Sequence, residues 1–322
     1  MTLEYAPFSP DLTSEWDSFV EKANNGTIFH LRKFLNYHPA GRFTDSSLVF
    51  TKKNELCAVT PAVVRDFEDE RVFHSHPGAS YGGVVLPADA RLDEIVEFVD
   101  ILIQNARMFH CNRIIMTVPP IYYNSKYSSY VDFALFANGF SYRIRELSSV
   151  VDLQPGPEQI YYHFPDTVKR AIRKAEREGV LVKESNDIKS YYNILKNNLE
   201  MRHNVKPTHT REELEYLHKL FPERIKLYAA EFRDEMIGGI VTFACNPRVN
   251  LAFYIAHIHS FQSVRPVDSI IWHLIQESYR QGFSYLDFGT FTLRMQPNWG
   301  LCRFKEKFGA CGIFRDTFER RV

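Results

Sequence analysis

The sequence predicts a mixed α/β fold of the α+β type, in which one unit occurs twice along the chain. Two observations lead to this prediction. The order strand, strand, strand, helix, strand occurs before residue 120 and again after residue 224. The turn at Asn54 precedes the buried strand at Ile114 by 60 residues, and the turn at Asp234 precedes Tyr285 by 51 residues. Each copy should therefore form a mixed, mostly antiparallel sheet that is flanked by helices.

The composition argues against several classes of protein. The 322 residues are enough for two domains or one large one, and 39 basic residues balance 39 acidic ones. This balance argues against a protein whose main role is to coat nucleic acid or an anionic membrane. No apolar run reaches the roughly 18 to 20 residues that span a bilayer, so no integral membrane segment is expected. The first residues do not resemble a signal peptide, and five cysteines without a CxxC pair favour a reduced, cytoplasmic compartment.

The first half contains local signals for two helices and four strands. Ser9-Pro10 is typical of a helix start, because proline is favoured at the first helical position. Runs rich in Val, Leu and Phe are separated by a polar turn and predict strands, and the last of them stops at Pro119-Pro120. The predicted elements are helix 10–23, strands 46–52, 56–67 and 71–76, helix 91–108 and strand 112–118.

The second half repeats this order after a helical stretch. Pro155–Pro157 is the best linker signal in the middle of the chain, and it predicts domains at 1–150 and 151–322. A helix that ends at Gly179 follows, and Thr210 begins a capping box that opens another. The predicted elements are helices 157–178 and 188–199, a helix from 210, strands 225–232, 236–244 and 250–258, helix 267–281 and strand 283–288.

The segment 168–179 is the most distinctive local feature. An apolar stripe runs along one face of the predicted helix, and the rest of its surface carries five cations, among them Lys169 and Arg173. Such a ridge could hold a phosphate-bearing ligand. The alternative is a solvated amphipathic helix, because charge runs are usually exposed faces.

The stretch 298–312 is the second candidate for chemistry. It begins with a loop at 298–300, and Phe304 and Phe308 then flank Lys305 and Lys307. A lysine among buried aromatic rings can stabilise developing negative charge, although lysines that reach past a buried ring to solvent are an alternative. Two H-x-H pairs, at 74–76 and 257–259, could ligate a metal. No HExxH motif or matching cysteine pair accompanies them, so no metal is expected.

Five segments, in the right order, resemble the FemABX and BioF2-like acyltransferases, which belong to the GNAT superfamily and contain two GNAT-like domains. The most recognisable is RAIRKAEREGV, which is similar to the family's R-K-A-x-x-x-G-V signature. The similarity covers nearly the whole chain. The segments are WDSFVEKANNGTIFHLRKFLNYH (16–38), RAIRKAEREGV (170–180), IKLYAAEFRDEMIGGIVTF (225–243), RPVDSIIWHLIQESYRQGFSYLDFG (265–289) and NWGLCRFKEKFG (298–309).

The resemblance implies transfer of an acyl or aminoacyl group to an amine. Family members with peptidoglycan roles take the group from charged tRNA and place it on a cell-wall precursor, whereas others are known only as acetyltransferases. The donor here is therefore expected to be acetyl-CoA or another acyl-CoA, or an aminoacyl-tRNA, with no tightly bound cofactor. The acceptor would be a peptidoglycan precursor or a related small molecule. In GNAT folds, backbone N–H groups at a splayed strand help to stabilise the oxyanion.

The resemblance also implies roles for individual residues. The closing Phe-Lys pair of the family maps onto Phe304 and Lys305, and Lys305 would stabilise charge on the donor. Lys169 and Arg173 would bind phosphate, and Arg265 would do so in a loop that lacks the glycine of CoA-binding loops. The acceptor would contact residues in the second half of the chain. Its candidates are Tyr254 and Arg202.

Three functions remain open at this level. The leading one is a Fem-like N-acyltransferase that acts on a cell-envelope precursor. The second is an N-acetyltransferase that uses acetyl-CoA on a small molecule or amino sugar. The third is a non-catalytic module that binds a phosphate-rich ligand, and it would not need Phe304 and Lys305. Helix 267–281 is compatible with packing inside the chain or across a homo-oligomer.

Overall fold

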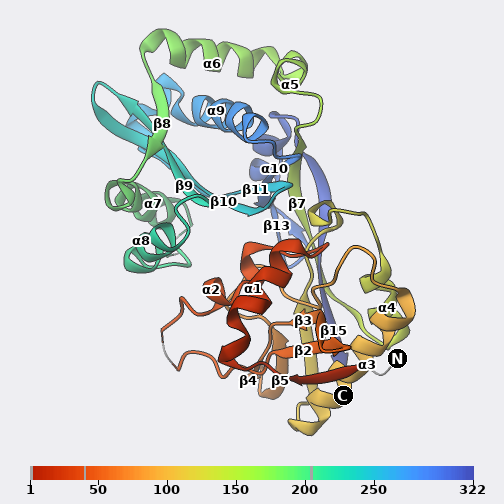
Figure 1. Ribbon diagram of the computed structural model, residues 1–322. Coiled ribbons are helices and arrows are strands. Elements are labelled where there is room, and N and C mark those ends of the chain that lie inside the picture. Colours follow the sequence, from red (N-terminus) through yellow and green to blue (C-terminus); the bar gives the residue numbers. More distant parts are fainter. Residues whose placement is uncertain (1–2, 40, 204–205) are drawn as a thin grey trace. The chain divides into compact units, whose positions relative to one another are not determined.

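The structure is a computed structural model that describes residues 3–39, 41–203 and 206–322 (Figure 1). It divides the chain into two units. The first contains Met1–Leu147 and Phe314–Val322, and the second contains Ser148–Ile313. Each unit is a mixed α/β unit, so the predicted fold class is confirmed. No helix among the described residues has both the length and the apolar character that a membrane span requires.

The first unit contains two sheets. In the smaller sheet, β1 (Glu4–Pro7), β2 (Leu48–Lys52) and β3 (Glu55–Thr60) are antiparallel. The larger sheet has the order β4-β5-β6-β15-β7, and β5 and β6 are parallel. Its bounds are β4 (Val63–Phe67), β5 (Glu70–Ser75), β6 (Arg113–Thr117), β15 (Cys311–Arg321) and β7 (Ser141–Asp152). The helices are α1 (Thr13–Lys22), α2 (Arg32–Leu35), α3 (Leu92–Met108) and α4 (Tyr130–Ala137), with short 3-10 turns at Pro10–Leu12, Ile28–His30 and Ile121–Tyr123.

One predicted strand of the first unit is two strands in the structure. The prediction ran from 56 to 67, but β3 ends at Thr60 and β4 begins at Val63 in the other sheet. Pro61 lies between them and has no backbone N–H to donate to a ladder. The proline therefore marks the point at which the chain passes from one sheet to the other.

The second unit contains the strand order β7-β12-β11-β10-β9-β8. Strands β9, β10 and β11 form an antiparallel meander, and β11 then pairs in parallel with β12. In Figure 1, α9 lies against this sheet and α6 lies beside α9. The bounds are β8 (Leu181–Ser185), β9 (Ile225–Phe232), β10 (Glu235–Asn246), β11 (Val249–His257), β12 (Tyr285–Thr290), α5 (Pro157–His163), α6 (Asp166–Glu178), α7 (Ile188–His203), α8 (Arg211–Leu220), a 3-10 turn at His259–Val264, α9 (Pro266–Arg280), the two-residue strands β13 (Thr292–Leu293) and β14 (Gln296–Pro297), and α10 (Trp299–Glu306).

Two predictions for helices in the second unit need correction. Helix 157–178 is two helices, and it breaks before Pro165 because a proline in a helix interior loses a hydrogen bond and clashes with the preceding turn. Residues 299 and 300, predicted as a loop, form the first turn of α10. The Asn298 side chain accepts a hydrogen bond from the Leu301 N–H at 3.0 Å and caps that helix.

The last strand of each half of the chain pairs with a strand of the other half. The chain leaves β6 through α4 and forms β7, whose residues 148–152 pair with β12 in the second unit. It leaves β12 through α10 and forms β15, whose residues 317–321 pair with β6 in the first unit. The predicted domain 151–322 therefore differs from the second unit at its C-terminal end, because these last residues complete the sheet of the first unit.

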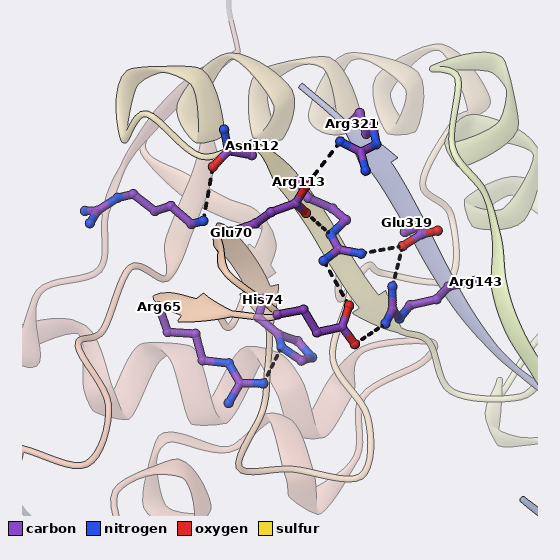
Figure 2. A network of polar contacts seen from close by, with 10 residues as sticks. Arg65, Glu70, His74, Asn112, Arg113, Arg143, Glu319 and Arg321 are labelled. Carbon is purple, nitrogen blue, oxygen red and sulfur yellow. Dashed lines mark hydrogen bonds and ion pairs between the residues drawn. The ribbon is translucent and has the colours of Figure 1, made fainter. Parts of the chain in front are cut away.

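An ion-pair network fixes the end of β15 in the first unit (Figure 2). The Glu319 carboxylate lies 3.3 Å from a guanidinium nitrogen of Arg113 and 2.7 Å from one of Arg143. Arg321 reaches Glu70 at 3.1 Å. Because the Arg113 side chain is largely buried, its three carboxylate partners compensate the loss of water around its charge.

Candidate active site

The candidate site begins where two parallel strands of the second unit separate. Strands β11 and β12 pair only over Val249–Leu251 and Tyr285–Asp287, although β11 continues to His257. On its other edge, β11 has a bulge against β10: Tyr254 pairs with Val241 and Ala252 pairs with Thr242, so that Phe253 is an extra residue. Beyond residue 251, the edge of β11 that faced β12 is outside the ladder.

A cavity of about 540 Å³ lies against this separated part of β11. Its walls come from five elements: the last residues of β11, the 3-10 turn at His259–Val264, the start of α9, α10 with the residue after it, and α7. It is open to solvent and large enough for part of a nucleotide-sized ligand. The principal lining residues are Asn198, Ile255, His257, Gln262, Arg265, Asp268, Asn298, Phe304 and Lys307.

Arg265 occupies a strained position at the mouth of the cavity. Its backbone is left-handed, with φ 63° and ψ 44°, and it is followed by Pro266, the first residue of α9. Glycine is favoured in this conformation, because other side chains clash with the backbone there. The following proline also disfavours helical backbone angles at the residue before it. The loop lacks the expected glycine but adopts a conformation that glycine would favour. Strain of roughly 1 to 3 kcal/mol at such a position is typical of a functional site.

Asp268 and Lys307 form an ion pair inside the cavity. The Lys307 Nζ lies 2.8 Å from Asp268 Oδ1, and the carboxylate is mostly buried in the first turn of α9. The ammonium also lies 5.0 Å from the ring centre of Phe304 and 4.7 Å from that of Phe308. The sequence prediction did not include either charged residue as a site residue. The only signals for them were the second lysine of the F-K-x-K motif and an acidic residue at a helix start.

Lys305 points away from the cavity lining and toward β12. Its side chain is buried, with a relative exposure of 6%, and Nζ donates hydrogen bonds of 2.8 Å to the carbonyls of Gly289 and Thr290. Burial lowers the pKa of Lys305 to about 8, and the nearby Asp287 carboxylate opposes that shift. Lys305 therefore satisfies carbonyl groups at the end of β12, where this strand has left β11.

The predicted phosphate-binding residues of α6 lie outside the cavity lining. Lys169 Nζ donates to the Tyr162 carbonyl at 2.7 Å, at the end of α5, and Arg173 Nε donates to the Lys169 carbonyl at 3.3 Å. Of the residues predicted to bind donor or to act in catalysis, the cavity brings together Arg265 and Phe304.

Tyr254, a predicted acceptor residue, does not line the cavity either. Its hydroxyl lies 2.9 Å from His209 Nδ1, and its carbonyl accepts a hydrogen bond from Tyr191 of α7 at 2.8 Å. Arg202, the other acceptor candidate, belongs to α7, and its side chain lies outside the described residues.

The H-x-H pairs do not form part of a larger ligand cluster in the described residues. No group of three or more His, Cys, Asp or Glu side chains suited to a metal occurs there. His74 Nδ1 lies 3.0 Å from a guanidinium nitrogen of Arg65, as Figure 2 shows. Burial and the Arg65 charge lower the pKa of His74 to about 3. A cation in front of the ring nitrogen opposes metal binding there.

One protein family matches part of the chain by sequence. Residues 164–306 match the family described as "Acetyltransferase (GNAT) domain". The match begins in the loop between α5 and α6 and ends at the last residue of α10, so it includes the whole cavity except Lys307. A search of curated proteins finds no match.

Solved structures with similar folds cover almost the entire chain. The crystal structure of FemX aligns with 99% of this chain and 97% of its own, with a TM-score of 0.77 and 12% identity. L-PGS from Bacillus licheniformis aligns with 98% and 92%, at a TM-score of 0.63 and 11% identity. A tandem GNAT protein from the clavulanic acid biosynthesis pathway aligns with 99% and 98%, at a TM-score of 0.57 and 10% identity. At these identities the similarity concerns the fold.

The matched segment contains both β11 and β12. The family match and the separation of these two neighbouring strands therefore concern the same part of the chain. The family match covers most of the second unit, and the structural neighbours share the fold of almost the whole chain. Residues 164–306 of the second unit match the GNAT acetyltransferase domain family, and the protein is an acyltransferase with a tandem GNAT fold.

Proposed function

We propose that this acyltransferase is Fem-like and transfers an acyl or aminoacyl group from a phosphate-bearing donor to an amine of a cell-envelope precursor. The observation that carries the proposal is the cavity between the separated edge of β11 and the start of α9. A carbonyl could accept hydrogen bonds from N–H groups of the strand edge, while a phosphate could meet Arg265, Lys307 and the helix start.

The proposed reaction is a direct displacement. The neutral amine attacks the donor carbonyl, and a new C–N bond forms. The tetrahedral oxyanion then collapses, and the C–S bond of a thioester or the C–O bond of an ester breaks. The amine proton ends on the departing thiolate or alkoxide, so that atoms and charge balance.

Phe304 of the cavity lining and Lys305 beside it in the sequence would assist this displacement. Phe304 would shield the donor carbonyl from water, because its ring forms part of the cavity wall. Lys305 would hold the end of β12 through its two carbonyl contacts and add positive charge near the reacting group. Lys169 and Arg173 would contact a more distant part of a long donor, such as a tRNA, from their positions on α6.

Transfer measured by mass spectrometry would test the proposal. Acetyl-CoA and aminoacyl-tRNA would be offered as donors, each with a nucleotide-linked peptidoglycan precursor and with a free amino sugar as acceptors. We expect an acylated precursor, and we expect Phe304→Ala to slow its formation. Absence of transfer to the precursor from either donor, with folded protein, would contradict the proposed substrate.

The second candidate is an N-acetyltransferase that uses acetyl-CoA on a small amine. The description of the matched family favours it. Thermal unfolding in the presence of CoA or aminoacyl-tRNA separates the two versions, because a ligand that binds the native state raises the unfolding temperature. Stabilisation by CoA alone would exclude the tRNA-dependent version.

A further inference from the structure

The first unit contains a second cavity, of about 590 Å³, to which no role has been assigned. It lies around the start of α3 and is closed by the segment that leads into α4. The walls are formed by residues 86–93, 95, 124 and 126–131 and by the pair Asn24-Asn25. All of them belong to the first unit.

This cavity has the same topological position as the candidate donor cavity. Helix α3 connects the parallel strands β5 and β6, just as α9 connects β11 and β12. Helix α4 follows the second strand of the first pair, and α10 follows the second strand of the other pair. Each cavity therefore lies between the start of the crossover helix and the region of the next helix.

The two cavities differ in whether a strand edge lines them, and acyl transfer requires the N–H groups of such an edge. Residues 255–257 of β11 line the cavity of the second unit, whereas no strand residue lines that of the first. A donor carbonyl in the first cavity would therefore meet no strand edge with N–H groups to offer. The first cavity has the features of a binding site without those of a transfer site.

Hydrogen-bonded side-chain amides hold the walls of the first cavity in place. Asn25 is buried; its amide donates to the Val84 carbonyl at 2.8 Å, and its oxygen accepts from the Leu86 N–H at 2.9 Å. Asn24 bridges to the other wall, where its amide donates to the Lys126 carbonyl and its oxygen accepts from the Lys126 N–H. A site that is ordered before binding loses less entropy when a ligand enters.

The charges and rings of the lining select the kind of ligand. The cations Arg91 and Lys126 balance the anions Asp89 and Asp93, and Arg91 already pairs with Asp93 at 3.0 Å. A phosphate or nucleotide would therefore find no excess of positive charge. Two tyrosines, Tyr127 and Tyr130, line the cavity with relative exposures of 55% and 47%.

We propose that this cavity binds a neutral, polyhydroxylated ligand: a sugar unit or a short neutral oligosaccharide. A sugar presents C–H groups that pack on tyrosine rings and hydroxyls that exchange hydrogen bonds with carboxylates, serines and backbone groups. The lining offers these partners and no net charge. Through such a site the first unit would hold the glycan part of a substrate or of the cell envelope.

Binding of neutral sugars to the full chain would be followed by NMR titration, with N-acetylglucosamine and its β-1,4-linked trimer as probes and with UDP and inorganic phosphate as charged controls. We expect saturable binding of the trimer, tighter than that of the monomer. In the double variant Y127A/Y130A the affinity should fall about tenfold or more. The matched control is Phe133→Ala, which removes an exposed ring of α4 that does not line the cavity.

Three results would overturn the proposal: no binding of either sugar, sugar binding that the tyrosine variant leaves unchanged, or binding of UDP or phosphate that depends on the two tyrosines. Because the titration contains no acyl donor and measures no turnover, its outcome is independent of the proposed transfer function. Circular dichroism of each variant verifies its fold, and both tyrosines are exposed enough for substitution to be tolerated.

Discussion

Arg265 combines backbone strain and positive charge at one residue, and substitutions can separate the two. Arg265→Gly should raise the unfolding free energy by about 1 kcal/mol, because glycine adopts the left-handed conformation without the side-chain clash. The same variant should weaken donor binding several-fold, because the guanidinium is lost. Thermal unfolding and donor titration measure the two effects.

Arg265→Lys is the matched control for this prediction, since it keeps both the charge and the strain. Its unfolding temperature should stay near that of the wild type, and donor affinity should fall less than in the glycine variant. If Arg265→Gly bound donor as tightly as the wild type, Arg265 would have no role in holding the phosphate.

Lys305 should make stability depend on pH in the alkaline range. Its pKa is about 8 in the folded protein and 10.5 in the unfolded chain, so the unfolded state holds more protons between these values. The free energy of unfolding should therefore rise as pH increases from 8 to 10.5, by an amount on the order of 3 kcal/mol. Below pH 8 the charged ammonium is buried, and its desolvation opposes folding.

Comparison of urea unfolding for the wild type and Lys305→Met across this pH range isolates the contribution of Lys305 to the free energy of unfolding. The two proteins share all other titrating groups. The methionine variant should lack this rise, and it should also leave the Gly289 and Thr290 carbonyls without their donor. Acyl transfer should fall in the same variant. An unchanged transfer rate with a folded protein would show that Lys305 takes no part in catalysis.

At the scale of elements, the start of α9 and the residue after α10 together determine the charge of the cavity that is proposed to bind the donor. Arg265, Asp268 and Lys307 give one net positive charge, because the Asp268 carboxylate offsets one cation. Asp268→Asn should raise the net charge to two and tighten binding of a phosphate-bearing donor about fivefold. Lys307→Met should weaken binding by a similar factor.

Titration of CoA into both variants at low and moderate salt gives the measurement, since a charge effect must shrink as salt rises. Identical affinities in the two variants would show that this ion pair does not face the donor. The pair joins residues 39 positions apart, and the sequence does not indicate that they meet.

The local signals predicted most elements well and missed those without such signals. Strand 225–232 has the predicted bounds, and the capping box at Thr210 is formed as expected. Helix α4 was not predicted, because apolar residues occur on all sides of it and no cap precedes it. Strand β15 was also not predicted. Its arginines and acidic residues interrupt the alternation of apolar residues that would indicate a strand with one buried face.

At the scale of the whole molecule, the first unit depends on a segment that is distant in the sequence, because residues 314–322 belong to it. A fragment of residues 1–150 lacks residues 317–321, which pair with β6 in the first unit. We expect this fragment to be aggregated or largely unfolded, because β6 would present an unpaired edge and Arg113 would lose the carboxylate of Glu319.

A synthetic peptide of residues 311–322, added during refolding, should restore soluble protein with protected amides in β6. Amide exchange measured by NMR reports the result, and the same peptide with Glu319→Lys is the control that should fail. A fragment 1–150 that folded cooperatively by itself would show that β15 is dispensable for the first unit.

The sequence by itself determined the order of many of the elements, the repeat and the resemblance to an acyltransferase family, because caps, turns and apolar periodicity are recorded within a few neighbouring residues. Only the tertiary structure decided that β7 and β15 exchange partners, that β11 and β12 separate, and that Arg265, Asp268 and Lys307 line one cavity while Lys305 turns away from it. The physical reason is that a strand offers the same backbone groups to any partner, so its pairing depends on contacts between residues far apart in the chain.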